Sequence, residues 1–150
     1  MNYYKLEGVQ VPENQWEAAL VALLKVPDIS RVFPGFWRYK ISKTPEAEDL
    51  GTLLSLCGLQ VLPCAVRGLL VVDYVGVLDS CKGVPENIVD NTVSDILATL
   101  ARFCSPGFLM QLWRPERFEA YYLRHGFKEW RLVEMMFDED PDLCGSIEED

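Results

Sequence analysis

The stretch PENIVDNTVSDILATLARFCSPGFLMQLW, residues 85–113, decides the fold that this chain is predicted to adopt. Its first part places apolar side chains three or four positions apart, which is the spacing of one helix face. Those side chains are Val89, Val93, Ile96, Leu97, Leu100 and Cys104. Pro85 and Glu86 suit a first helical turn, the run 105–107 (Ser-Pro-Gly) closes the helix, and residues 108–113 read as a strand. The sequence therefore predicts a long amphipathic helix that leads directly into a strand.

The segment upstream of this helix is rich in Val, Leu and Cys and has few charges. Gly58, Pro63 and Gly68 interrupt it. Such punctuation is typical of short consecutive strands that are buried on at least one face. We expect three strands, at about 52–57, 60–66 and 69–77.

The two flanks complete the predicted order of elements. Residues 2–9 suit a strand, and an apolar repeat over residues 16–24 predicts a helix that ends before Pro27. A loop is expected at 26–36, a strand or extended arm at 36–41, and a short helix from about residue 44. Pro115 and Glu116 suggest a second amphipathic helix to about Arg124, followed by a strand over 128–138. We expect an α/β (α+β) fold with a mixed, partly antiparallel central sheet flanked by helices.

Charge divides the chain into a domain and a tail. The chain of 150 residues carries a net charge of −9, and seven of its acids lie in residues 138–150, which hold no base. We therefore predict one domain at 1–137 and an acidic C-terminal tail, which is either a solvated terminus or a docking strip for a basic partner. An acidic chain repels phosphate backbones, so nucleic-acid binding is not expected. No apolar run is long enough to cross a membrane, and no secretory signal is seen.

The cysteines favour reduced thiols in the cytoplasm. Five are present, at positions 57, 64, 81, 104 and 144, with no C-x-x-C pair, and there is one histidine, His125. A structural metal site is therefore not expected. A catalytic pair of one cysteine with His125 stays open as an alternative.

Residues 114–127, RPERFEAYYLRHGF, carry a resemblance to a known family. The segment resembles the C-terminal motif of the GNAT superfamily of N-acetyltransferases, in which the pattern is Asn-x-x-Ala-x-x-Leu-Tyr-x-x-x-Gly-Phe. Tyr122 stands four residues before Gly126, and Gly126-Phe127 matches the Gly-Phe pair. The predicted order of strands and helices over about 52–138 also resembles the layout of this family.

The resemblance implies an acetyl-CoA site between two splayed parallel strands, here those at 69–77 and 108–113. Tyr122 would be the general acid that protonates the leaving thiolate, since a neutral phenol can donate a proton to sulfur. The alternative is that Tyr122 is a core residue with its hydroxyl at the rim. Val75, Val77, Lys82 and Gly83 would contact the cofactor.

The phosphate-binding loop departs from the family pattern, which is Gln/Arg-x-x-Gly-x-Gly/Ala. Between the strand and the long helix this chain has one glycine, Gly83, and one cation, Lys82. Pro85 lacks an N–H, and three acids lie where a diphosphate would bind; they are Asp79, Glu86 and Asp90. Pro115 replaces the family asparagine. The loss of donors and the added negative charge predict weak binding of acetyl-CoA.

Three functional hypotheses follow. The first is a GNAT-fold protein with a degenerate acetyl-CoA site that acts as a structural or partner-binding protein, similar to small GNAT-like proteins of tailed phages, virion components included. Its contact surface would be an aromatic N-terminal cluster, Phe33, Phe36, Trp37 and Tyr39, or the acidic tail. The second is an active N-acetyltransferase in which Asp73, Glu129 or Glu134 attracts an amine. The third is another α+β binding module. The expected location is the cytoplasm, or a virion assembled there.

Overall fold

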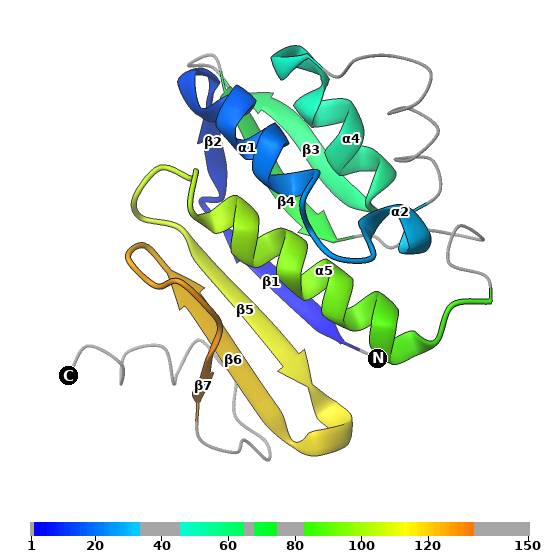
Figure 1. The fold of residues 1–150 in the computed structure, drawn as a ribbon. Coiled ribbons are helices and arrows are strands. Elements are labelled where there is room, and N and C mark those ends of the chain that lie inside the picture. The colour runs from blue at the N-terminus through cyan, green and yellow to red at the C-terminus, as the bar shows by residue number, and fades with distance from the viewer. Residues whose placement is uncertain (1, 34–45, 65–67, 75–82, 134–150) are drawn as a thin grey trace.

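The computed structural model describes residues 2–33, 46–64, 68–74 and 83–133, and these form two layers (Figure 1). Helices lie on one side of two antiparallel sheets, whose strand orders are β1-β5-β6-β7 and β2-β4-β3. The predicted α/β (α+β) class is therefore confirmed, with two small sheets in place of one central sheet. The division into a domain at 1–137 and a tail stays a prediction, because residues 134–150 lie outside the described part.

The boundaries of the elements follow the chain in this order. The strands are β1 (Tyr3–Glu7), β2 (Gln10–Pro12), β3 (Leu59–Cys64), β4 (Gly68–Tyr74), β5 (Leu109–Arg114), β6 (Glu119–Arg124) and β7 (Arg131–Val133). The α-helices are α1 (Trp16–Leu23), α2 (Ile29–Val32), α4 (Leu50–Leu56) and α5 (Glu86–Ala101). Short 3-10 turns precede α1, α4 and β6; they are η1 (Glu13–Gln15), η2 (Ala47–Asp49) and η3 (Pro115–Arg117).

The N-terminal segment joins the two sheets, because its two halves pair with different strands. β1 pairs with β5, and β2 pairs with β4. Between them Gly8 adopts φ +62°, a left-handed conformation that glycine reaches without steric strain. Beyond the bend, the Val71 N–H donates to the Val9 carbonyl at 2.8 Å, and the Ser105 N–H donates to the Gln10 carbonyl at 2.8 Å. One bent segment thus lies between β4 and β5.

α5 covers the junction with its predicted apolar face. Val93, Ile96, Leu97 and Leu100 are buried, and Val89 packs against the same core. This core also contains side chains of both sheets and of the other three helices. The helical prediction from the apolar repeat is confirmed, as are strands close to those predicted at 60–66, 69–77 and 108–113.

The predicted strand at 52–57 is wrong, because these residues belong to α4. The buried side chains of this helix are Leu50, Leu53 and Leu54, which have the i, i+3, i+4 spacing of one helix face. Leucine is a good helix former, whereas the absence of valine and isoleucine removes the strongest strand signal. Gly58, at φ +84°, follows the helix as a glycine stop.

The predicted helix at 115–124 is also wrong. The 3-10 turn η3 ends at Phe118, whose left-handed backbone (φ +53°) stops helical propagation. Residues 119–124 then form β6, which pairs with β5 along its whole length. Gly126, at φ +93°, follows β6 near the start of the turn toward β7 and does not cap a helix. The strand predicted at 128–138 is limited, within the described residues, to β7.

The loop predicted at 26–36 contains the short helix α2. Its Ile29 and Val32, together with Phe33, lie in the core, and Phe33 is only 1% exposed. Phe33 is therefore not part of an exposed aromatic surface, contrary to the sequence-based hypothesis. Phe36, Trp37 and Tyr39 lie outside the described residues.

Truncation of Leu97 tests the placement of α5. The Leu97→Ala variant should lose about 2–5 kcal/mol of unfolding free energy, because the side chain is fully buried and its removal leaves a cavity. Urea denaturation would measure the loss. A loss below half a kcal/mol would contradict this placement.

Replacing Gly8 or Gly51 by alanine should change the unfolding free energy in opposite directions. Gly8→Ala places a Cβ on a left-handed residue, 3.4 Å from the Gly107 carbonyl oxygen, and should cost about 1–2 kcal/mol. Gly51→Ala lies within α4, where the new Cβ would make ordinary contacts with Leu69, and should gain about 0.5–1 kcal/mol. Denaturant midpoints of the two variants would check both signs, and an unchanged or raised midpoint for Gly8→Ala would contradict the role of Gly8.

Candidate functional site

The structure places Tyr122 differently from the expectation based on the family resemblance. Tyr122 lies on β6, opposite Gln111 of β5, and not on a helix. Neighbouring strand residues point to opposite faces, and Leu123 belongs to the core beneath α5. Tyr122 therefore points away from α5, where its ring packs edge-to-face on Phe127 with centroids 5.4 Å apart. The sequence alternative, that Tyr122 is a core residue with its hydroxyl at the rim, agrees with the burial of this residue, and its role as a general acid stays a prediction.

The two strands expected to enclose acetyl-CoA are not neighbours. β4 and β5 belong to different hydrogen-bonded sheets, and the bent segment β1–β2 pairs with both. Of the expected cofactor contacts, Val75, Val77 and Lys82 lie outside the described residues. Gly83 is exposed, with φ +85°, in the turn before α5.

The acids proposed to attract an amine do not come together as one group. Asp73 is exposed on β4, and its carboxylate accepts a hydrogen bond from the Tyr74 N–H. Glu129 is exposed on the loop between β6 and β7. Glu134 lies outside the described residues.

The two thiols that the structure describes are buried, and they are expected to be unreactive in the folded protein. Cys57 and Cys104 lie in the core, and burial raises the pKa of each thiol to about 12. His125, the candidate base, is exposed beyond the end of β6. Within the described ranges, no group of three or more His, Cys, Asp or Glu side chains could hold a metal ion, and no helix is long and apolar enough to span a membrane.

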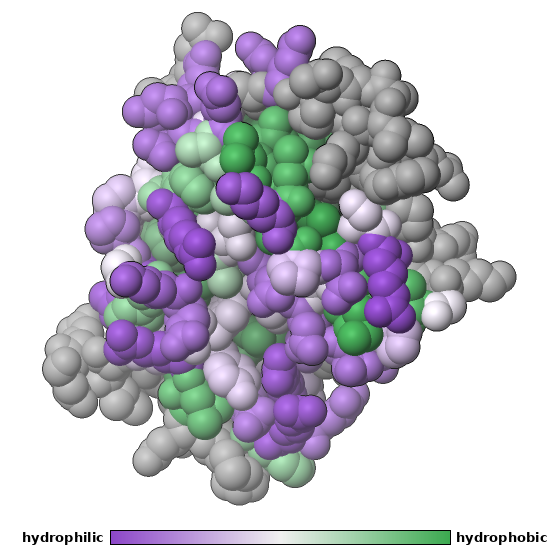
Figure 2. All heavy atoms as spheres, viewed as in Figure 1, coloured by the Kyte–Doolittle hydropathy of each residue, from purple (hydrophilic) through white to green (hydrophobic). Residues whose placement is uncertain are grey.

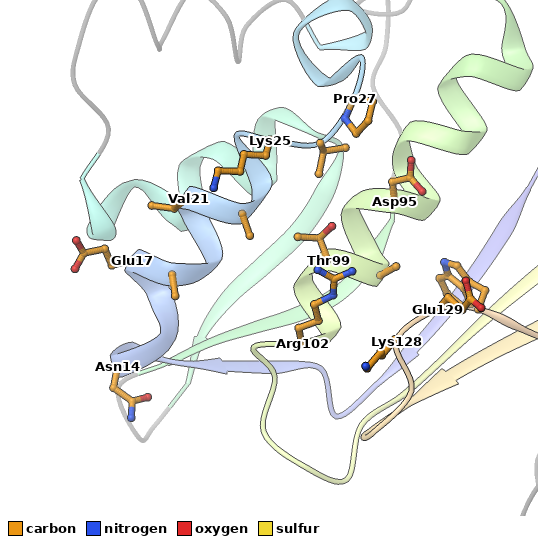
Figure 3. A pocket seen from close by; sticks show the side chains of 15 residues that line it. Asn14, Glu17, Val21, Lys25, Pro27, Asp95, Thr99, Arg102, Lys128 and Glu129 are labelled. Carbon is orange, nitrogen blue, oxygen red and sulfur yellow. The ribbon is translucent and has the colours of Figure 1, made fainter.

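An open groove lies between α1 and α5, and the loop after β6 closes one side of it (Figure 3). Its volume is about 980 Å³. Its lining residues are Asn14, Glu17, Ala18, Val21, Ala22, Lys25, Val26, Pro27, Asp95, Ala98, Thr99, Arg102, Lys128, Glu129 and Trp130. We call this feature the α1–α5 groove.

Small side chains from the two helices line part of the groove. Ala18 and Ala22 come from α1, and Ala98 and Thr99 come from α5. Val21 adds apolar surface and is 48% exposed. Figure 2 shows hydrophobic residues at the surface in the region of α1 and α4, bordered by hydrophilic ones. A solvent-facing helix surface of this kind is unusual, because exposed helix faces normally carry charged side chains.

Charged side chains of both signs edge the groove. The cations are Lys25, Arg102 and Lys128, and the carboxylates are Glu17, Asp95 and Glu129. No salt bridge between any of these six and another described residue is found in the structure. Asp95 is exposed, and partial burial of its carboxyl raises its pKa. The groove thus combines small apolar side chains with charges that have no salt-bridge partner in the described part of the chain.

The sequence contained a signal for this groove that the helix prediction did not use. The apolar repeat located the inner face of α1, whose Leu20 and Leu23 are buried. The outer face of the same helix reads Ala18, Val21 and Ala22, so α1 is apolar on both sides and has one charge, Glu17. A helix that is apolar all round is typically covered on both sides.

Comparisons with known proteins found no relative of this chain. No family model matches the chain, and neither the curated proteins nor the solved structures gave a match. The resemblance to N-acetyltransferases therefore rests on the residue types of 114–127 and on a predicted order of elements that the structure changes at 52–57 and at 115–124.

The two described thiols should resist modification until the protein unfolds. Iodoacetamide under native conditions should leave Cys57 and Cys104 unmodified, whereas both should react in denaturant, because only the thiolate attacks. Mass spectrometry of the digested protein would check this. Rapid native modification of either would contradict its burial.

The same thiols should make stability depend on alkaline pH. Their pKa values are near 12 when folded, whereas thiols in an unfolded chain titrate near ~8.5. The folded state therefore binds more protons between these values, and the unfolding free energy should fall as pH rises above about 8.5. Urea midpoints at pH values on both sides of this point would measure the effect, and the Cys57→Ser, Cys104→Ser double variant should lose it.

Proposed function

We propose that the protein acts by binding another protein, and that the α1–α5 groove is its docking site. The observation that carries this proposal is the combination, around one open groove, of small apolar side chains and six charges that form no salt bridge with another described residue. A partner protein with charges of opposite sign at matching positions can form salt bridges with these groups, and such complementarity gives specificity. This develops the sequence hypothesis of a partner-binding protein and moves its contact surface to α1 and α5.

The partner chemistry that fits the groove is an amphipathic helix. Helices dock into grooves through apolar side chains at i, i+3, i+4 and i+7. Ala22 and Ala98 leave room for the backbone of a third helix to approach closely, in the way that small residues do where helices cross. Trp130, which is partly exposed at the groove, supplies an aromatic anchor of the kind enriched at interfaces. The partner helix would carry a narrow apolar stripe flanked by charges of both signs.

Acetyl transfer receives less support. The resemblance implies two neighbouring strands that open around the cofactor, and a tyrosine on a helix beside them. In this chain a third segment pairs with both β4 and β5, and Tyr122 lies on the strand β6, with its side chain on the face opposite Leu123. Binding of acetyl-CoA is nevertheless simple to measure, and it separates the two hypotheses.

The test is a selection of helical peptides, with the binding site mapped by hydrogen exchange. Peptides selected on the folded protein should protect amides of α1 and α5 and of the loop at 125–130. Acetyl-CoA at millimolar concentration should leave the melting temperature unchanged. Protection confined to other elements would overturn the groove as the docking site. A saturable shift with acetyl-CoA that Tyr122→Phe abolishes would favour a transferase.

Substitution inside the groove should weaken peptide binding without unfolding the protein. Ala98→Glu puts a long charged side chain between the two helices and should reduce the affinity of a selected peptide at least about tenfold, or 1.4 kcal/mol. The matched control is Leu62→Glu, which changes an exposed apolar residue of β3 outside the groove. Equal loss in both variants would argue against a groove-specific contact.

A further inference from the structure

A second hollow, of about 350 Å³, lies where α5 begins and β5 ends. Asn2 borders it just before β1, the first two turns of α5 form one wall, and Arg114 with η3 forms the other. The described residues that line it are all polar or charged; they are Asn2, Glu86, Asn87, Asp90, Asn91, Arg114, Glu116 and Arg117. Three separate segments thus bring charges of both signs to one small space, which we call the polar cavity.

Two N–H groups of the polar cavity residues have no acceptor among the described residues. Asn2 Nδ2 and Arg114 Nε are both shielded from solvent, and neither donates a hydrogen bond. The Arg114 guanidinium lies over the Tyr121 ring, 5.3 Å from its centroid. A buried donor without an acceptor costs stability. Acceptor oxygens of a ligand, a carboxylate above all, would satisfy these groups and pair with the guanidinium.

The carboxylates of Asp90 and Glu86, which also line the polar cavity, would be stabilised by a positively charged group. Burial raises the pKa of the Asp90 carboxyl and the nearby Glu86 charge raises it further, and these two causes outweigh the N-terminal ammonium group and Arg114, which lower it. Among the described residues no salt bridge to Asp90 is found. An ammonium group beside Asp90 would offset both effects, because an opposite charge favours the ionised carboxylate.

We infer that the polar cavity binds a small zwitterion, of the class of free α-amino acids. The ligand carboxylate faces Asn2 and Arg114, and its ammonium group faces Asp90. A simple carboxylate would meet the charges of Glu86 and Asp90, and a simple amine would meet Arg114 and Arg117, so a ligand with both groups fits best. The volume is at the small end of the range for small-molecule sites, which is about 300–1,000 Å³.

The test is a thermal-shift and calorimetric screen of the standard amino acids, with acetate and methylammonium as ligands that carry one charge each. At least one amino acid should raise the melting temperature in a saturable manner, whereas neither singly charged compound should do so at the same concentration. Absence of any saturable amino-acid binding would overturn the inference. A shift with acetate as large as that with the best amino acid would also overturn it, because it would indicate a simple anion site.

Three substitutions locate the binding. Asp90→Asn and Arg117→Gln should each weaken the affinity of the amino acid found in the screen about tenfold or more, since each removes one charge from the polar cavity. Asp95→Asn is the matched control: it is on the same helix, its carboxyl pKa is also raised by burial, and it lines the α1–α5 groove instead. It should leave the affinity unchanged. Unchanged affinity in both cavity variants, or an equal loss in the control, would contradict the site.

Discussion

The bend at Gly8 is the constraint on which the arrangement of the described elements depends. A single segment pairs with β5 before the bend and with β4 after it, so the two sheets share a strand run and are not independent. β5 pairs antiparallel with the first half of this run and β4 pairs antiparallel with its second half. α5 connects β4 to β5 in the sequence and covers the junction with its apolar face (Figure 1). The position of α5 is therefore set by the strand below it.

The position of α1 follows from the same segment. The Trp16 indole N–H donates to the Val11 carbonyl at 2.9 Å, which ties the first residue of α1 to β2. Leu20 and Leu23 then bury the inner face of this helix, and α1 lies beside α5 with its second apolar face outward. The α1–α5 groove is thus a consequence of how the N-terminal segment is bent and anchored.

The sequence predicted correctly those elements whose hydrophobic pattern fits only one type of secondary structure. The repeat in α5 extends over four turns and could not be read as a strand, and the valines and leucines of β4 could not be read as a helix. The secondary structure of residues 50–56 and 119–124 was harder to predict, because a short apolar run can form a helix or a strand. Residues 50–56 form a helix, as their leucine spacing indicates. Residues 119–124 form a strand, because pairing with β5 outweighs the helix-like sequence between Pro115 and Gly126.

The second of these errors changes what the resemblance can contribute. The role proposed for Tyr122 required a helix that directs the phenol toward a bound thioester. On β6 the alternation of side chains directs it to the opposite face from Leu123, and so away from α5. A match of residue types at fixed spacing therefore transfers a function only when the local structure is shared, since the same spacing projects side chains differently from a strand and from a helix.

Ser94 of α5 links the surroundings of the two candidate sites. Its hydroxyl hydrogen-bonds the Tyr4 hydroxyl at 2.8 Å, and the Tyr4 hydroxyl donates to the backbone carbonyl of Asp90, a residue of the polar cavity, at 3.5 Å. Its carbonyl accepts a hydrogen bond from the indole N–H of Trp130, which lines the α1–α5 groove, at 3.0 Å. Burial raises the pKa of the Tyr4 phenol, so the hydroxyl stays protonated and keeps both roles, donor and acceptor. A continuous chain of hydrogen bonds thus joins Asp90 of the polar cavity to Trp130 of the α1–α5 groove, through α5, which borders both sites.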